Sequence, residues 1–328
     1  MSARRAIPTD VRAVADIFRV ARTNPERGIV ASALPIPFVA ALSDPFTLVR
    51  GGLGIHPMAR LFVESQGRVR AAALVFVSRR PEWVVLLLAA RPDPGGADGA
   101  FRVLSEICAA AAREGMQRVF AAVPDQQLSR ETLFQAGFYS YTTETWYVAS
   151  GPVSAARKAE RPVRPARGRD AHDLFKLYLR TTPHAVQRAE QLSVSDFDLD
   201  GKAGALAPPH LLQGNPLSMR RGTMLLTRDG DDEVDAAYVA FHGRGVHPHV
   251  CKLRTARIDV DLARDLVRIG AVSLDARHAI ACPVRPYEEH VARALESEGF
   301  RSVAGAMLFV KELAVRIEER ALAPAVVR

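Results

Sequence analysis

A short unit that occurs twice constrains the fold of this chain more than any other feature of the sequence. Residues 133–148 read LFQAGFYSYTTETWYV, and residues 295–310 read LESEGFRSVAGAMLFV. Each copy is typical of a helix end, a Gly-Phe corner and an alternating strand. Gly137 and Gly299 lie 162 residues apart, as do the valines that end the two copies. Glycine supplies the left-handed conformation that ends a helix, and two corners at matched spacing predict a duplicated domain.

The elements predicted around the two corners follow the same order in both halves of the chain. Each half shows two helices, three strands, a helix, a strand, a helix and the closing unit. The first half has helices at 10–22, 29–42, 97–114 and 126–136 and strands at 60–65, 68–78, 83–90 and 117–123. The second has helices at 170–180, 185–192, 261–274 and 287–298 and strands at 223–227, 234–242, 246–258 and 277–283.

Three consecutive strands followed by a β-α-β crossover predict an α/β chain of the α+β type. Each half is expected to form a mixed, mostly antiparallel sheet with helices on both faces. The length of 328 residues fits two domains of about 150 residues each. The predicted division is 1–150 for the first domain, 151–168 for a linker or first strand, 161–314 for the second domain and 315–328 for a tail.

Composition and charge exclude several classes of protein. The longest apolar run, residues 83–90, is shorter than the roughly 20 residues that cross a bilayer. The N-terminus has no signal-peptide core and the three scattered cysteines form no CxxC motif, so a cytoplasmic protein without membrane contact is expected. The net charge is +8, but 39 of the 44 basic residues are Arg and they are interleaved with acids. This pattern favours a solvated basic surface over a nucleic-acid partner.

The element order and the Gly-Phe corners resemble the N-acetyltransferase (GNAT) superfamily, as two tandem copies that cover nearly the whole chain. The resemblance implies that backbone N–H groups at the start of the third helix hold an acyl-CoA pyrophosphate, because a helix N-terminus presents free donors and positive dipole charge. The family pattern there is Gln/Arg-x-x-Gly-x-Gly/Ala. Residues 92–97, PDPGGA, keep its small residues but begin with Pro92.

The cofactor implied is acetyl-CoA or another acyl-CoA, and a set of small residues and one arginine would hold it. These residues are Gly95, Gly96, Ala97, Gly99 and Arg102. The alternative is a plain Pro/Gly loop before a helix capped by Asp98. The corresponding stretch of the second half, RTARIDVD at 254–261, has no glycine and carries two Asp at the helix start. We therefore expect that half to be degenerate as a cofactor site.

Catalytic residues are harder to identify. Family enzymes often carry a Tyr four residues before the corner glycine as general acid, and here both positions are leucine, Leu133 and Leu295. The remaining candidates are Glu82 and His247 as general bases and Tyr139 near the closing strand; for Glu82 the alternative is a solvated turn residue, and for Tyr139 it is packing. Positioning an amine against a thioester supplies much of the rate without a dedicated acid.

A histidine-rich strand leaves a metal site as one interpretation. His247, His249 and Cys251 alternate along one predicted strand, and His242 precedes the turn before it, which is a donor set that suits Zn²⁺. No carboxylate lies nearby, and Pro248 indicates a bulge that would disturb the alternation. A half-buried strand lined by histidines is the alternative.

Two classes of function remain open from the sequence. The first is an acyl-CoA-dependent N-acyltransferase with its cofactor in the first half, acting on an amine-bearing small molecule or protein. The second is a non-catalytic tandem GNAT-fold protein that binds or scaffolds a protein or nucleic-acid partner. The glycines at 95 and 96 favour the first, and the missing tyrosines favour the second.

Overall fold

We describe the fold from a computed structural model, in which residues 3–23, 30–32, 59–77, 80–124, 127–151, 153, 162–197, 220–229, 232–243 and 248–314 are described. No helix among these residues is long and apolar enough to cross a membrane. The three cysteines, Cys108, Cys251 and Cys282, are buried free thiols.

Apart from the helix expected at 29–42, the first half contains the predicted strands and helices in the predicted order. Its strands are β1 (Arg4–Arg5), β2 (Val30–Ser32), β3 (Ala59–Gln66), β4 (Arg68–Val77), β5 (Glu82–Ala90), β6 (Arg118–Pro124) and β7 (Tyr139–Ala149). Its helices are η1 (Pro8–Asp10), α1 (Val11–Thr23), α4 (Pro94–Arg113) and α5 (Gln127–Gln135). The helix expected at 29–42 is wrong at 30–32, where the chain forms β2, and its other residues lie outside the described ones.

The second half follows a similar order, with α7 and η3 where the described residues of the first half form β2. Its strands are β8 (Val163–Pro165), β9 (Arg220–Arg228), β10 (Val234–His242), β11 (His249–Thr255), β12 (Ile280–Val284) and β13 (Arg301–Glu312). Its helices are η2 (Gly168–Asp170), α6 (Ala171–Thr181), α7 (His184–Glu190), η3 (Val194–Phe197), α9 (Val260–Val272), η4 (Pro286–Glu288) and α10 (Glu289–Ser297).

The two Gly-Phe corners have the same backbone geometry. Gly137 has φ +80° and Gly299 has φ +83°, which is the left-handed conformation that favours glycine. The N–H of Phe138 donates to the carbonyl of Leu133 at 3.0 Å, and the equivalent bond from Phe300 measures 3.1 Å. This hydrogen bond spans six residues, as in the Schellman motif at the C-terminus of a helix. Both phenylalanines are buried where the closing strands begin.

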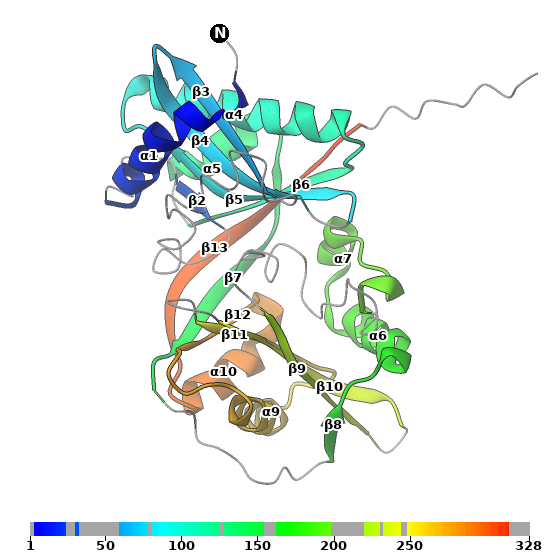
Figure 1. The fold of residues 1–328 in the computed structure, drawn as a ribbon. Coiled ribbons are helices and arrows are strands. Elements are labelled where there is room, and N and C mark those ends of the chain that lie inside the picture. The colour runs from blue at the N-terminus through cyan, green and yellow to red at the C-terminus, as the bar shows by residue number, and fades with distance from the viewer. Residues whose placement is uncertain are drawn as a thin grey trace, which may run out of the picture.

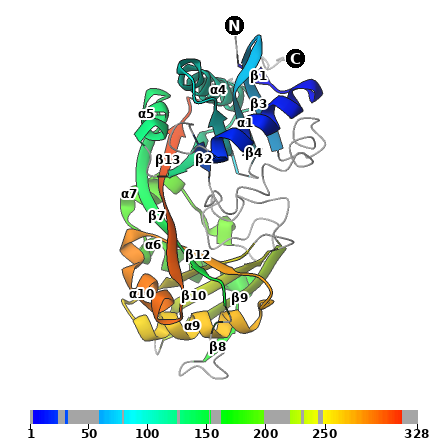
Figure 2. The same ribbon diagram turned by 90° about the vertical axis from the view of Figure 1, so that its left-hand side faces the viewer.

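The closing strands are exchanged between the halves. Along the described strands the sheet order is β1-β3-β4-β5-β6-β13-β7-β12-β11-β10-β9-β8, with β2 paired to β5 off this path. β13, the last strand of the second half, pairs antiparallel with β6 of the first, and β7 of the first half pairs antiparallel with β12 of the second. Figures 1 and 2 show β7 and β13 side by side where the two halves meet. Each half therefore needs the other to complete its sheet.

Helices cover both faces of this continuous sheet. On one face, α1 and α6 contribute Val14, Ile17, Leu174 and Leu177 to a core that runs through both halves. On the other face, α4 and α5 pack over the first half and α9 and α10 over the second (Figure 1). This confirms the predicted fold class, a mixed sheet with helices on both faces in each half.

Parallel neighbours separate in the middle of each half. β5 pairs with β6 only from Glu82–Arg118 to Val85–Ala121, although β5 continues to Ala90. β11 pairs with β12 only at two positions, His249–Ile280 and Val250–Ala281. Beyond these pairs the strands diverge, and each half has an opening between its two central strands.

Candidate functional site

The N-terminus of α4 lies at the end of the first opening, and its glycines are required by close packing. A Cβ on Gly96 would lie 1.9 Å from the carbonyl oxygen of Arg91, so only glycine fits there. A Cβ on Gly95 would lie 2.8 Å from Nη1 of Arg70, so the absence of a side chain leaves room for that guanidinium. The sequence therefore places an arginine directly over the first turn of a 20-residue helix.

Several arginines make this helix start electropositive. Arg68 pairs at 2.9 Å with Asp93, which immediately precedes α4 and makes no capping hydrogen bond through its side chain, and so offsets the charge of the acid closest to the first turn. Arg91 donates from Nε to the carbonyl of Val69 at 3.0 Å. The buried Nε of Arg70 has no hydrogen-bond partner among the described residues. A helix dipole, an unused guanidinium N–H and the pairing of Asp93 with Arg68 together favour an anion.

The other predicted cofactor residues lie further along the same helix. Ala97 is half-buried in the first turns, and Gly99 packs against Ala71 and the carboxylate of Glu64. Arg102 lies about 10 Å along the helix from Gly95, as seven residues of helical rise dictate. Its Nη1 pairs with Oε1 of the buried Glu64 at 3.2 Å. The structure thus brings the small residues together at the helix start. Arg102 lies further along the helix and pairs with Glu64 on β3 of the sheet.

Strand β2 occupies the opening in the first half. Val30, Ala31 and Ser32 pair antiparallel with Ala89, Leu88 and Leu87 of β5. Because β4 already pairs with the other edge of β5, β2 must use the edge that faces β6, against which it also lies. The backbone of Leu87–Ala89 on this edge of β5 is therefore paired with β2.

Buried charges fill the opening in the second half. Nζ of Lys252 on β11 donates to the carbonyl of Pro283 on β12 at 2.9 Å and to Glu288 at 2.6 Å, so an ammonium group bridges the separated strands. Arg285 pairs with Glu190 at 2.6 Å and lies 3.6 Å from Glu144, which β7 of the first half contributes. Charged side chains therefore stand where the first half has the apolar ends of β5 and β6.

The two buried carboxylates of this network, Glu288 and Glu144, have pKa values shifted in opposite directions. Burial alone would raise the pKa of Glu288, but Lys252 and the neighbouring arginines lower it. Burial raises the pKa of Glu144 to about 7, and the nearby Arg285 only partly offsets this effect. Neither carboxylate oxygen of Glu144 has a hydrogen-bond partner among the described residues. Sequence reasoning missed these residues, although Lys252 and Arg254 alternate on one face of a predicted strand.

The start of α9 differs from that of α4 as the sequence predicted. The carboxylate of Asp259 accepts a hydrogen bond from the N–H of Leu262 at 2.9 Å and caps the helix. Asp261 follows in the first turn and pairs with Arg264. A carboxylate of the chain itself thus takes the donors that a phosphate would use.

The fold is shared with solved structures. A GCN5-related N-acetyltransferase from Sphaerobacter thermophilus matches with a TM-score of 0.55 at 15% identity, covering 94% of this chain and 95% of that one. The chain has the GNAT fold. A second solved structure, from Pyrococcus horikoshii, matches this GNAT-fold chain with a TM-score of 0.50 at 11% identity, covering 95% and 89% of the two chains. No protein-family model matches the sequence, and a search of curated proteins gave no match.

Two catalytic candidates, Glu82 and Tyr139, lie near Arg118 and not at the helix start. Glu82 is fully buried, so its interpretation as a solvated turn residue is wrong; burial raises its pKa to about 7, and Arg80 and Arg118 lie 3.6 and 3.9 Å away. The hydroxyl of Tyr139 donates to Glu312 at 3.0 Å. Both Tyr139 and Glu82 lie close enough to Arg118 to favour its charged form electrostatically. Glu82 and Ala90 are eight strand residues apart, about 26 Å, so Glu82 lies at the opposite end of β5 from α4.

The histidines of the proposed metal alternative are used in packing and hydrogen bonds. His249 accepts from the N–H of Gly243 through Nδ1 at 3.1 Å, which leaves Nε2 to donate to the carbonyl of Asp275 at 3.0 Å. His242 and His278 pack edge-on against its ring. Cys251 belongs to the buried core instead, and His247 lies outside the described residues. Among the described residues no His, Cys, Asp or Glu cluster is arranged to hold a metal.

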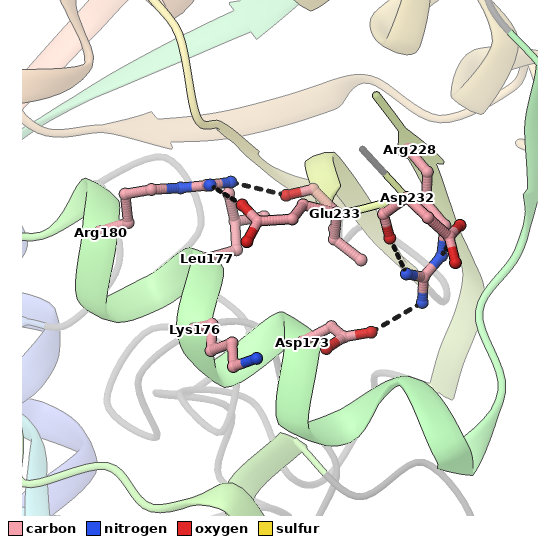
Figure 3. A pocket seen from close by; sticks show the side chains of 8 residues that line it. Asp173, Lys176, Leu177, Arg180, Arg228, Asp232 and Glu233 are labelled. Atoms are coloured by element: carbon pink, nitrogen blue, oxygen red, sulfur yellow. Dashed lines mark hydrogen bonds and ion pairs between the residues drawn. The ribbon is translucent and has the colours of Figure 1, made fainter. Parts of the chain in front are cut away.

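A pocket of about 530 Å³ lies between α6 and the β9–β10 hairpin (Figure 3). Its charged residues pair with one another: Asp173 with Arg228 at 2.8 Å, and Arg180 with Glu233. Lys176 has no ion pair among the described residues. Because the other charges on its walls are matched, this pocket gives a charged ligand little beyond one exposed ammonium group.

Proposed function

We propose that the first half binds an acyl-CoA at the N-terminus of α4 and that the chain transfers the acyl group to an amine of a small molecule or protein in the cytoplasm. The observation that carries this proposal is the Arg70 guanidinium, which lies over Gly95. Its buried Nε–H has no hydrogen-bond partner among the described residues. A pyrophosphate placed there would gain charge-assisted hydrogen bonds from Arg70 and from the helix start. Arg68 supports this by neutralising Asp93.

The pantetheine arm fits only if β2 leaves the edge of β5. β2 has three residues, so a ligand that forms amide hydrogen bonds with β5 competes with a short strand. We infer that acyl-CoA and β2 exclude each other along Leu87–Ala89. The three-residue pairing is the part of the first half that binding must rearrange.

The reaction relies on positioning rather than on a dedicated acid. When bound, the cofactor supplies an activated thioester. The chain contributes the phosphate grip at α4 and the apolar walls of β5 and β6, which exclude water from the reacting centre. Leu133 has no proton to give, so the proton that an attacking amine would lose would have to reach the leaving thiolate directly or through water.

We further propose that the second half binds no acyl-CoA. Its opening holds the Lys252–Pro283 bridge, and Asp259 caps α9. Placing a cofactor there would unpair Lys252 and Glu288 in a buried environment, which costs several kcal/mol.

Calorimetric titration with acetyl-CoA tests both statements. We expect one acetyl-CoA per chain, with affinity reduced roughly a hundredfold in Gly95→Glu, because the new carboxylate pairs with Arg70 and repels phosphate. Arg257→Glu, in the corresponding loop of the second half, is the matched control and should bind as the wild type does. Equal affinity of Gly95→Glu and wild type would place the cofactor elsewhere.

A second function is a cofactor-free binding protein with the GNAT fold. The pairing of β2 with β5 favours it, because this pairing satisfies the strand edge that a cofactor would use. Absence of heat with acetyl-CoA, together with an unchanged melting temperature, would select this function over the first.

A further inference from the structure

The second half contains a small pocket that the acyl-CoA proposal does not use. It has a volume of about 140 Å³ and lies between the end of β11, the following loop and the start of α10. Its lining includes Thr181, Arg254, Thr255, Tyr287, Glu288 and His290. Cofactor-sized pockets usually measure about 300 to 1,000 Å³, so this one is too small for coenzyme A. It has room for a molecule that displaces about five waters.

Arg254 gives this pocket its charge. The residue is 2% exposed, and its guanidinium lies over the ring of Tyr178 with 4.9 Å between Cζ and the ring centre. Nη1 donates to the hydroxyl of Thr182 at 2.8 Å. Nε and Nη2 have no hydrogen-bond partner among the described residues. A buried guanidinium with two unused nitrogens is costly unless an acceptor reaches it.

The carboxylate closest to Arg254 is already neutralised. Oε2 of Glu288 accepts from Lys252 at 2.6 Å and from the N–H of Arg285 at 3.0 Å. Its Oε1 stays 3.9 Å from Nη1 of Arg254, beyond hydrogen-bond distance. Lys252 therefore balances Glu288, and the charge of Arg254 lacks a hydrogen-bonded counter-ion among the described residues.

The remaining polar groups around the pocket favour an anion over a cation. Burial lowers the pKa of His290, which favours the neutral ring, and its Nε2 lies 2.5 Å from the hydroxyl of Thr255. Arg257 is an exposed cation at the pocket mouth. It forms ion pairs with Asp229 at 3.6 Å and with Asp235 at 3.8 Å. Arg257 is offset by Asp229 and Asp235, and Glu288 by Lys252, so the excess positive charge of the pocket is that of Arg254.

We propose that this pocket binds a small oxyanion, a carboxylate or a phosphate group on a molecule of only a few heavy atoms, through the unused guanidinium nitrogens of Arg254. The planar guanidinium offers Nε–H and Nη2–H side by side, the geometry that recognises two oxygens of one carboxylate or phosphate. The second half then has a ligand of its own, smaller than and chemically distinct from an acyl-CoA. The proposal does not depend on cofactor binding in the first half.

The test is a titration of the wild-type chain with sodium phosphate and, separately, with sodium acetate at constant ionic strength. The readout is the ¹H–¹⁵N resonance of the Arg254 Nε–H, assigned through its own side-chain carbons. We expect a saturable shift of this resonance with one or both anions, and the anion that gives the tighter dissociation constant identifies the group recognised. Arg254→Lys should weaken binding at least about tenfold, because lysine keeps the charge but lacks the planar pair of N–H donors of the guanidinium.

Arg293→Lys is the matched control, since Arg293 is an exposed arginine on α10 that pairs with Glu289. It should bind the anion as the wild type does. Three results would overturn the proposal: shifts confined to exposed arginines, no shift of Arg254 with either anion, or a shift of Arg254 with acetyl-CoA as large as that with phosphate. The resonance is measured in the unmodified chain, so the outcome does not depend on whether the Arg254 variant folds.

Discussion

Replacing Glu144 with Gln should change how the stability of the chain depends on pH. Glu144 lies on the exchanged strand β7, is 1% exposed and faces the charge network of the second half. Burial raises its pKa from 4.5 to about 7. Glutamine has nearly the same shape and removes the titration, so the comparison isolates one proton.

The sign follows from which state holds the proton. Between pH 4.5 and 7 the folded chain keeps the Glu144 proton and the unfolded chain has lost it, so stability falls as the pH rises. This contribution is complete below pH 4.5 and is lost as the pH passes the folded pKa of about 7. Integrating over the two pKa values gives a loss of about 2.5 kcal/mol between pH 5 and pH 8.

The assay is urea unfolding at pH 5 and pH 8, followed by the fluorescence of the two buried tryptophans, Trp83 and Trp146, the second of which lies on the same strand as Glu144. Relative to wild type, Glu144→Gln should gain about 2.5 kcal/mol on going from pH 5 to pH 8. Glu289→Gln, at a side chain that is 72% exposed, is the control and should follow the wild-type curve. Parallel curves for Glu144→Gln and wild type would refute the burial of this carboxylate by the exchanged strand.

The glycines give two further predictions, both measured as unfolding free energies. Gly96→Ala should destabilise the chain by about 2 kcal/mol or more, because its Cβ would lie 1.9 Å from the Arg91 oxygen, whereas Gly151→Ala, with open space around it, should stay within about 0.5 kcal/mol of wild type. Gly137→Ala and Gly299→Ala should each cost about 1 to 2 kcal/mol, because both hold positive φ; a neutral result at either would contradict the helix ends described.

The sequence predicted the features that depend on local backbone chemistry. The Gly-Phe corners fix a helix end and a strand start within six residues, so the amino-acid sequence alone is enough to recognise the repeat. The sequence also holds a second repeat. Arg4 pairs with Asp10 and Arg164 with Asp170, each at 2.7 Å, at the start of the two halves. The shared spacing of arginine and aspartate was available in the sequence as a signal.

Features that depend on distant partners could not be predicted in the same way. Alternation shows which face of a strand is apolar, but it does not show which strand lies beside it, so the exchange of β7 and β13 was not foreseen. Glu82 looked like a turn residue because charged residues flank it, and only the approach of Arg80 and Arg118 accounts for its burial. Lys252 is buried for the same reason, since Glu288 and Pro283 reach it from another strand and helix.

Hydrogen–deuterium exchange with and without acetyl-CoA tests the difference between the two halves most directly. Acetyl-CoA should slow exchange at Gly95–Ala100 on α4 and speed it in β2 at Val30–Ser32, while α9 and the strands around Lys252 stay unchanged. The same protection at the start of α9 as at α4, or none at either, would contradict the assignment of the cofactor to the first half.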